Sequence, residues 1–153
     1  MIQIQGIDHV AINCRDLDKS LDFYTRIFGL KVTGREPSKP GTEYFLDCGP
    51  SLLGLIQAKN LENNHLFDHE ALGANHFSFR IHAKDFDGMI KRLEENYVQI
   101  EFAKKRDKSW SLYFYDLDGN KLEVTAWPRE DELTSSNLRK EIYDPKTKLW
   151  ESY

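Results

Sequence analysis

One order of predicted elements occurs twice along the chain, and this repeat constrains the fold more than any other feature. Residues 6–14 alternate between polar and apolar side chains, as strands do, and residues 16–28 carry an apolar stripe at helical spacing. Three strand-like runs follow, at residues 31–35, 43–47 and 52–57, with glycine and proline between them. The first half therefore predicts a βαβββ module.

The helix of this first module has a recognisable beginning and end. Asp16 stands where a side-chain oxygen can cap the first turn, and Gly29 follows the last apolar residue of the stripe. After a polar connector, the same order of elements returns as an alternating strand, a helical stripe and three strand-like runs: residues 75–81, 85–96, 98–102, 111–115 and 121–126.

The two halves can be superposed at their ends. Residues 44–47 match residues 113–116, residues 53–55 then match 122–124, and His9 and His76 take the same place in their strands. Neither half closes a sheet alone, so the duplication suggests a shared site at the join.

We therefore predict an α+β fold in which two βαβββ modules form a cupped mixed sheet with helices on its outer face. The modules cover residues about 4–58 and 74–127 of a single domain, 1–127. Residues 128–153 are a C-terminal extension that begins at the break made by Pro128. We expect a short helix at residues 134–143. The terminal aromatic residues Trp150 and Tyr153 predict that the extension docks on the sheet or on a second subunit.

Strand periodicity brings three candidate metal ligands onto one face. His9, His76 and Glu123 each lie opposite the large apolar residues of their strands. Two imidazoles and one carboxylate form a triad that leaves coordination positions open for water and substrate, and it suits Fe(II), Mn(II), Zn(II) or Ni(II). Taken singly, a strand histidine is more often a hydrogen-bonded structural residue, so the shared facing carries this prediction.

Arg80 and Thr125 share the face of the three candidate ligands. They are candidate substrate-binding residues. The alternative is that each is a polar side chain satisfied inside the sheet.

Several segments resemble the vicinal oxygen chelate superfamily, which includes glyoxalase I, extradiol dioxygenases, fosfomycin-resistance enzymes, methylmalonyl-CoA epimerase and bleomycin-binding proteins. The segments are G-I-D-H-V-A-I-N, L-D-K-S-L-D-F-Y-T-R-I-F-G-L, H-F-S-F-R-I and L-Y-F-Y-D-L-D-G-N-K-L-E, and the resemblance covers roughly residues 4 to 127. It implies that His9, His76 and Glu123 are metal ligands and that the protein forms a homodimer. The bleomycin-binding members lack these ligands, so their presence favours catalysis over simple binding.

Departures from the family pattern bear on the reaction. Gly54 stands where glyoxalase I has a fourth ligand, which indicates a three-ligand site and disfavours that chemistry. Tyr113, Asp116, Gly119 and Glu123 match the extradiol dioxygenase pattern, although Leu117 replaces its proline and no histidine shortly precedes Tyr113. Tyr113 is the candidate catalytic residue, with packing as the alternative role.

The fosfomycin-type enzymes share the segment S-L-Y-F-Y-D-L-D-G-N-K-L-E. Lys104, Lys105 and Arg106 precede it and are candidates to cradle a phosphonate, or they form a solvated loop. After the ligand glutamate those enzymes continue with histidine, glycine and leucine, whereas this chain has residues 124–127, V-T-A-W. This departure counts against them.

We therefore expect a divalent-metal enzyme, glyoxalase-like in the broad sense, that acts as a lyase or isomerase on a small substrate with vicinal oxygens. An extradiol dioxygenase is the first alternative, followed by a fosfomycin-type thiol transferase and a non-catalytic binding protein. A net charge of -4 without a strongly basic stretch argues against nucleic acid as a partner. Without a long apolar run we expect no membrane partner and a cytoplasmic location.

Overall fold

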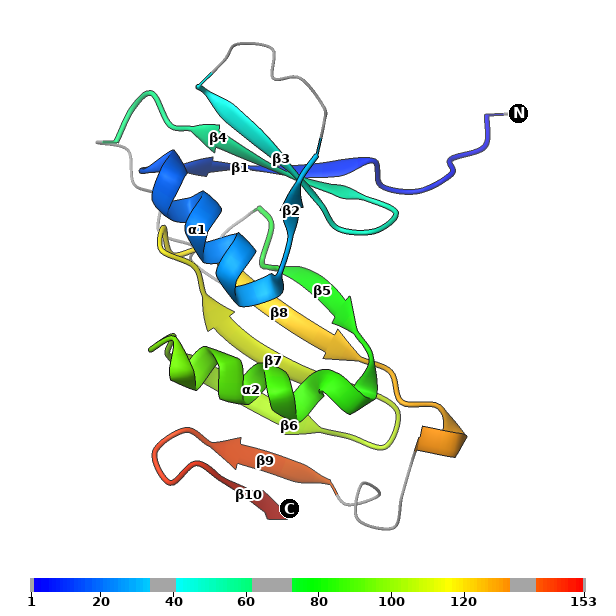
Figure 1. The fold of residues 1–153 in the computed structure, drawn as a ribbon. Helices are drawn as coiled ribbons and strands as arrows, with labels where there is room; N and C mark the ends of the chain where they lie inside the picture. The colour runs from blue at the N-terminus through cyan, green and yellow to red at the C-terminus, as the bar shows by residue number, and fades with distance from the viewer. Residues whose placement is uncertain (1, 34–40, 62–72, 133–139, 153) are drawn as a thin grey trace. The chain divides into compact units, whose positions relative to one another are not determined.

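The computed structural model describes residues 2–33, 41–61, 73–132 and 140–152 (Figure 1). The chain divides into two compact units, Met1–Asn64 (unit 1) and His65–Tyr153 (unit 2). The described residues form one mixed sheet of four strands and one of six, with a helix in each unit. This confirms the predicted α+β class and its two βαβββ modules. Within the described residues, no helix is both long and apolar enough to cross a membrane.

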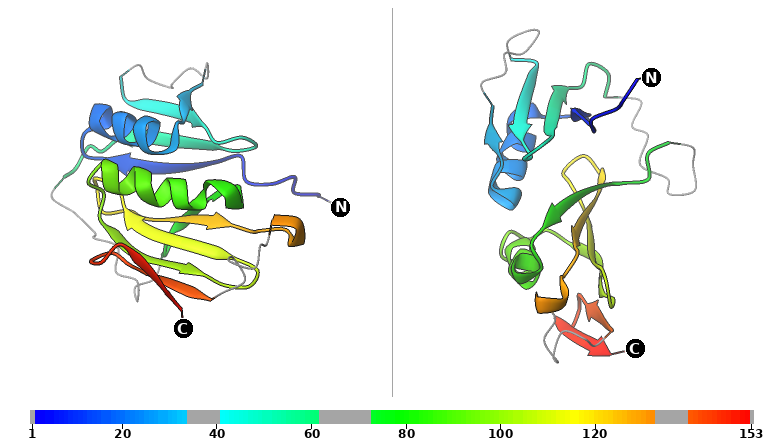
Figure 2. Two further views of the ribbon diagram at one scale, coloured as in Figure 1. Left: turned by 60° about the horizontal axis from the view of Figure 1, so that its bottom comes forward. Right: turned by 90° about the vertical axis from the view of Figure 1, so that its right-hand side faces the viewer.

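Unit 1 contains one four-stranded sheet with the strand order β1-β4-β3-β2. Strand β1 runs parallel to β4, and the other pairs are antiparallel. Helix α1 lies along one face of this sheet (Figures 1 and 2). The bounds of these elements are β1 His9–Cys14, α1 Leu17–Phe28, β2 Lys31–Val32, β3 Glu43–Asp47 and β4 Leu52–Gln57. The predicted strand at 31–35 extends into residues 34–40, outside the described residues.

Both predicted ends of helix α1 are confirmed. The Asp16 carboxylate accepts a hydrogen bond from the Lys19 backbone N–H, and Gly29 ends the helix in the left-handed conformation, with φ of 72°. The buried face comprises five residues: Leu17, Ser20, Phe23, Tyr24 and Ile27.

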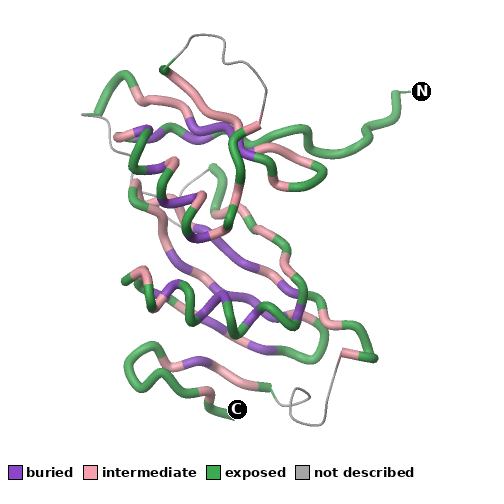
Figure 3. The backbone as a smooth tube through the Cα atoms, viewed as in Figure 1, coloured by how far each residue is buried: buried purple, intermediate pink, exposed green. Residues whose placement is uncertain are grey.

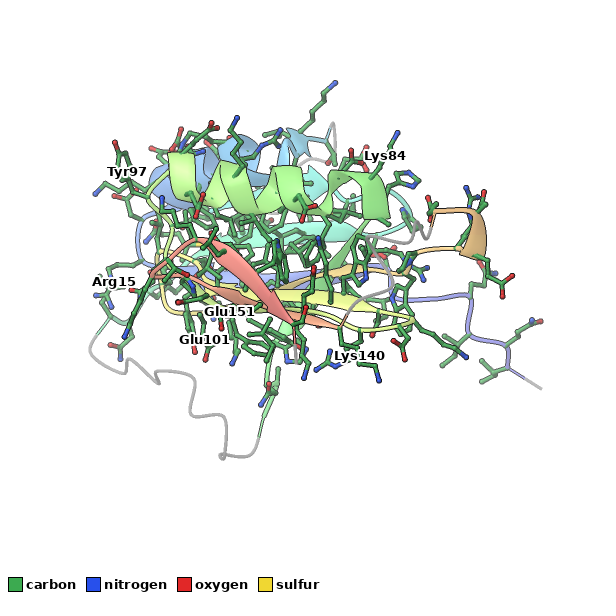
Figure 4. All side chains as sticks on the ribbon, turned by 90° about the horizontal axis from the view of Figure 1, so that it is seen from below. Arg15, Lys84, Tyr97, Glu101, Lys140 and Glu151 are labelled. Atoms are coloured by element: carbon green, nitrogen blue, oxygen red, sulfur yellow. The ribbon has the colours of Figure 1, made fainter. Side chains whose placement is uncertain are left out.

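Unit 2 contains the second module and the C-terminal extension in one sheet, with the strand order β10-β9-β6-β7-β8-β5. Helix α2 covers one face of it, and its buried residues alternate with exposed ones around the helix (Figure 3). Lys84 and Tyr97 lie at its two ends (Figure 4). The elements are β5 Phe77–Ile81, η1 Ala83–Asp85, α2 Phe86–Glu95, β6 Ile100–Lys105, β7 Trp110–Tyr115, β8 Lys121–Ala126, η2 Glu130–Glu132, β9 Glu141–Asp144 and β10 Leu149–Ser152.

The C-terminal extension docks on the edge of the unit 2 sheet. Strands β9 and β10 form a hairpin, the C-terminal ribbon, and β9 pairs antiparallel with β6. Residues 133–139 lie outside the described residues, but Glu141–Asp144 is a strand, so the predicted helix at 134–143 is wrong in that part. Tyr143 is buried there, and its ring centroid lies 5.4 Å from that of Trp150.

The strand register corrects the superposition of the two halves. Gly54 pairs with Phe45, whereas Glu123 pairs with Tyr113. Since Gly54 and Glu123 correspond, Phe45 and not Tyr44 is the counterpart of Tyr113. The cause is the hairpin loop, which spans residues 48–51 in unit 1 and residues 116–120 in unit 2, one residue more.

Candidate metal centre

His76 and Glu123 come together on the sheet face of unit 2 that faces away from α2. Nε2 of His76 lies 3.2 Å from Oε2 of Glu123, and the side chains are 32% and 11% exposed. Glu123 is aligned across the sheet with Ser78 on β5 and Tyr113 on β7. Its neighbours along β8, Leu122 and Val124, are fully buried on the other face. The predicted alternation therefore places this carboxylate on the face of the candidate site.

The surroundings of Glu123 keep its carboxyl group ionised. Burial acts to raise its pKa, but hydrogen bonds from Tyr113, Ser111 and Ser78, together with the nearby His76, outweigh burial and lower it. An ionised carboxylate is the form that binds a metal ion. Neither serine was among the predicted site residues, although both fall on the ligand face once the strands are in register.

Tyr113 stands beside both His76 and Glu123. Its ring meets the His76 ring edge-on, with centroids 5.5 Å apart and planes at 86°. Burial, followed by the hydrogen bond to the Glu123 carboxylate, raises the pKa of Tyr113 to about 12. The hydroxyl therefore keeps its proton near neutral pH, which makes it a hydrogen-bond donor rather than a base.

His9 lies in unit 1 and has surroundings of the same kind. Its ring meets Phe45 edge-on, with centroids 6.1 Å apart and planes at 88°. Its Nδ1 atom lies 2.6 Å from Oδ1 of Asp8. The structure brings His76, Tyr113 and Glu123 together within unit 2, whereas His9 lies in unit 1 beside Asp8 and Phe45. Among the described residues, no three histidine, cysteine or acidic side chains form a ready-made group for a metal ion.

The space beside Gly54 explains why this position carries no ligand. A Cβ atom there would lie 3.3 Å from Cε1 of Phe45 and 3.4 Å from Cβ of Ala11. A longer side chain would have to displace the Phe45 ring, which packs against His9. Position 54 of unit 1 therefore has little room for a longer side chain unless Phe45 moves.

The donor geometry at His76 fits a metal ion. Nδ1 of His76 lies 2.8 Å from Oδ1 of Asn75, an amide oxygen that only accepts hydrogen bonds, so Nδ1 carries the ring proton in the neutral form. With the ring proton on Nδ1, the Nε2 lone pair faces the Glu123 carboxylate, and a proton or a metal ion between these two atoms satisfies both of them. Ligand bonds of about 2.1 Å put adjacent donors about 3.0 Å apart in an octahedron and about 3.4 Å apart in a tetrahedron. The observed 3.2 Å lies between these values.

The predicted substrate-binding residues lie on this same face. Arg80 pairs with Thr125 across β5 and β8, and the Thr125 hydroxyl forms a hydrogen bond with the Ser78 hydroxyl. Arg80 is exposed, whereas Thr125 is partly buried. The structure thus gives Thr125 a hydrogen-bonded neighbour in the site and leaves Arg80 open to solvent at its border.

Two cations influence Tyr113. Lys121 lies two residues before Glu123 on β8, and its Nζ atom is 5.3 Å from the Tyr113 ring centroid. The same Nζ atom lies 2.8 Å from Oε2 of Glu101, which is labelled in Figure 4. The charge of Arg106 acts to lower the Tyr113 pKa, so it too lies within electrostatic reach. Lys121 was not among the predicted site residues.

Lys105 does not belong to this basic group. Its side chain is 6% exposed, and Nζ lies 2.8 Å from Oδ1 of Asp87 on α2. The same atom lies 5.0 Å and 4.4 Å from the ring centroids of Trp110 and Trp150. The suggestion that Lys105 helps to cradle a phosphonate is therefore wrong, because strand alternation turns it toward the helix side.

Known proteins resemble this chain over most of its length. The family model described as "Glyoxalase/Bleomycin resistance protein/Dioxygenase superfamily" matches residues 6–124. The metallothiol transferase FosB of Staphylococcus epidermidis is 32% identical over 136 residues, which cover 86% of this chain and 89% of that protein.

Solved structures share the fold. A glyoxalase/dioxygenase from Nostoc punctiforme superposes with a TM-score of 0.72 at 24% identity, over 82% of this chain and 92% of that one. A point mutant of the fosfomycin resistance protein FosX of Listeria monocytogenes, in complex with Mn(II) and 1S,2S-dihydroxypropylphosphonic acid, superposes with a TM-score of 0.64 at 21% identity. That alignment covers 85% of this chain and 97% of FosX. The family match spans both modules, and the two-module fold agrees with it. This chain belongs to the Glyoxalase/Bleomycin resistance protein/Dioxygenase superfamily.

Proposed function

We propose that the protein is a metal-dependent enzyme that binds one divalent ion through His9, His76 and Glu123. The observation that carries this proposal is the approach of Nε2 of His76 to the ionised Glu123 carboxylate, at 3.2 Å. His9 supplies the third ligand from unit 1, either of the same chain or of the partner in a homodimer. Three protein ligands leave positions where vicinal oxygens of a small substrate can bind.

Within this class we propose thiol transfer to a small phosphonate epoxide such as fosfomycin. The metallothiol transferase relative supports this reaction over the glyoxalase-like and dioxygenase alternatives. The three-ligand set agrees with it, and Lys121 and Arg106 beside Tyr113 provide positive charge for a phosphonate. The V-T-A-W segment at residues 124–127 remains a departure from the fosfomycin-type pattern.

The chain's own residues have distinct parts in this reaction. A bound metal ion supplies Lewis acidity toward the epoxide oxygen. As the thiolate sulfur bonds to an epoxide carbon, the carbon–oxygen bond breaks and the oxygen takes up a proton. Tyr113 holds a proton at Oη and can donate a hydrogen bond to developing oxyanion charge. Lys121 and Arg106 attract and orient the phosphonate oxygens.

Phosphorus NMR of fosfomycin, with the protein, Mn(II) and either cysteine or glutathione, tests this function. We expect a new resonance that needs both the thiol and the metal. Glu123→Gln and His76→Ala should each abolish it, whereas His82→Ala, which changes an exposed histidine outside the site, should not. The transferase would be contradicted if metal-loaded protein formed no adduct with either thiol. Oxygen uptake with catechols and Fe(II) would also contradict it.

A further inference from the structure

Each candidate histidine ligand is contacted by the side chain of the residue before it. Oδ1 of Asp8 lies 2.6 Å from Nδ1 of His9, and Oδ1 of Asn75 lies 2.8 Å from Nδ1 of His76. The two contacts use the same ring nitrogen and occupy corresponding positions of the two modules. The two modules differ at other corresponding positions, such as Gly54 and Glu123. The contact to Nδ1 is nevertheless present at both histidines, which associates it with the histidine and not with the acidic ligand.

The chemistry of these contacts determines which ring nitrogen is available. The oxygen atoms of an ionised carboxylate and of an amide accept hydrogen bonds and do not donate them. Nδ1 must therefore carry the proton in both neutral imidazoles, and the lone pair remains on Nε2. In His76, Nε2 is the atom that faces Glu123. A metal-binding histidine commonly donates its other ring N–H to such an oxygen, which fixes the tautomer and the orientation of the ring.

A role in folding is a weak explanation for the pair in unit 1. The side chains of His9 and Asp8 are 40% and 79% exposed. Solvent-exposed pairs of this kind contribute little to stability. The main effect of the contact is thus on the ring, which Asp8 orients from one edge while Phe45 packs against it.

We propose that Asp8 and Asn75 are positioning residues that hold His9 and His76 in the Nδ1–H tautomer and direct both Nε2 atoms to the metal ion. This inference rests on the metal site proposed above. The two modules differ in strength, because Asp8 is charged and Asn75 is neutral. A charged carboxylate holds the ring N–H of His9 more strongly than a neutral amide holds that of His76, so the loss of Asp8 should weaken metal binding more than the loss of Asn75.

Calorimetric titration of the full chain with Mn(II) measures the effect. We expect Asp8→Ala and Asn75→Ala each to raise the dissociation constant by about 10- to 100-fold, with the larger change for Asp8→Ala. Asp8→Asn keeps an acceptor oxygen and should recover much of the affinity. Asp131→Ala removes a carboxylate that is 72% exposed in unit 2 and serves as the control with unchanged affinity. Circular dichroism verifies that each variant is folded.

Nitrogen-15 NMR of the metal-free protein provides a second readout that does not depend on activity. We expect the Nδ1–H tautomer for neutral His9 and His76, and its loss in the matching alanine variant. Unchanged affinity and tautomer in both alanine variants, with metal binding still abolished by His76→Ala, would overturn the positioning role alone. A wild-type protein without His76-dependent metal binding would instead overturn the proposed site.

Discussion

At the scale of single residues, the two modules repeat a small arrangement around each histidine. An edge-on aromatic ring, Phe45 or Tyr113, lies beside it, and Gly54 or Glu123 lies across from that ring. Only unit 2 has a carboxylate and a phenol at these places. The duplication therefore preserves the framework of the site, while a single pair of substitutions confines the acidic ligand and the hydroxyl donor to one module.

The packing of Phe45 over Gly54 leads to a residue-scale prediction. Gly54→Ala places a methyl group 3.3 Å from the Phe45 ring, so that ring must shift, and we expect a loss of about 1 kcal/mol in the free energy of unfolding. In a Phe45→Leu background the same substitution should cost less, with a coupling of at least about 0.5 kcal/mol. Urea unfolding of the wild type, both single variants and the double variant measures this cycle. Strictly additive effects would contradict the contact.

At the scale of elements, the C-terminal ribbon depends on contacts with α2 as well as on strand pairing. The Tyr143 hydroxyl donates a hydrogen bond to the Glu94 carboxylate on α2, and Nζ of Lys148 lies 3.7 Å from the same carboxylate. Lys105 joins Asp87 on α2 to the ring of Trp150. The ribbon is thus linked to the helix through side chains of both β9 and β10.

Alkaline unfolding tests the contact between Tyr143 and Glu94. Burial, then the Glu94 carboxylate, raises the pKa of Tyr143 above its usual 10.0. Above about pH 10 the unfolded chain releases this proton while the folded chain retains it, so the free energy of unfolding falls as pH rises from there toward the raised folded value. Tyr143→Phe should flatten this fall and cost about 1 kcal/mol near neutral pH.

Urea unfolding at a series of pH values between 7 and about 12 measures this dependence. Tyr113, whose pKa is about 12, contributes in the same direction, so part of the slope should remain in Tyr143→Phe. Tyr97→Phe changes a side chain that is 97% exposed and serves as the control. An identical slope in the wild type and Tyr143→Phe would contradict the prediction.

The sequence predicted those elements whose signals are local. Alternation and strand-like runs located β1, β3, β4, β5, β7 and β8, and apolar stripes located both helices, with capping residues marking the ends of α1. These signals depend only on near neighbours in the sequence. The ribbon was missed because β9 and β10 are stabilised by pairing with β6 and by the contact with Lys105, which lie far away in the sequence. The offset of Phe45 was missed for a related reason, since loop length fixes hairpin register.

Much of the candidate site also followed from the sequence. Strand alternation predicted that His76 and Glu123 share a face, and the resemblance to extradiol dioxygenases pointed to Tyr113. The strand register aligns Tyr113 with Glu123 across β7 and β8. The roles of Asp8 and Asn75 could not be predicted in this way, because side chains of adjacent strand residues normally point to opposite faces. Only the rotamers reveal that each one turns back toward the histidine ring.

At the scale of the whole molecule, the proposed ligands come from both units. Metal that binds the folded chain should raise its stability by about 2.7 kcal/mol at a concentration 100-fold above the dissociation constant. For a chain of this length we expect the melting temperature to rise by roughly 5 to 10 °C. His9→Ala and Glu123→Ala should each remove this rise in calorimetry. A rise that survives in His9→Ala would mean that unit 1 contributes no ligand.

A mixture of His9→Ala and Glu123→Ala chains tests the expected homodimer and the origin of His9. If His9 acts on the metal site of its partner, a mixed dimer carries one intact site, and mixing should restore part of the metal binding. If all three ligands come from one chain, mixing should restore none. Light scattering establishes the mass of each species, and a monomeric mass would contradict the homodimer.

The enclosure of Lys105 between Trp110 and Trp150 has a practical consequence. Indole fluorescence responds to solvent and to nearby charge, and Trp110 is 3% exposed whereas Trp127, outside this group, is 53% exposed. Release of the C-terminal ribbon would hydrate Trp110 and move its emission to longer wavelength, while Trp127 would hardly change. The protein therefore carries its own optical reporter, which distinguishes detachment of its last two strands from unfolding of the rest of the sheet.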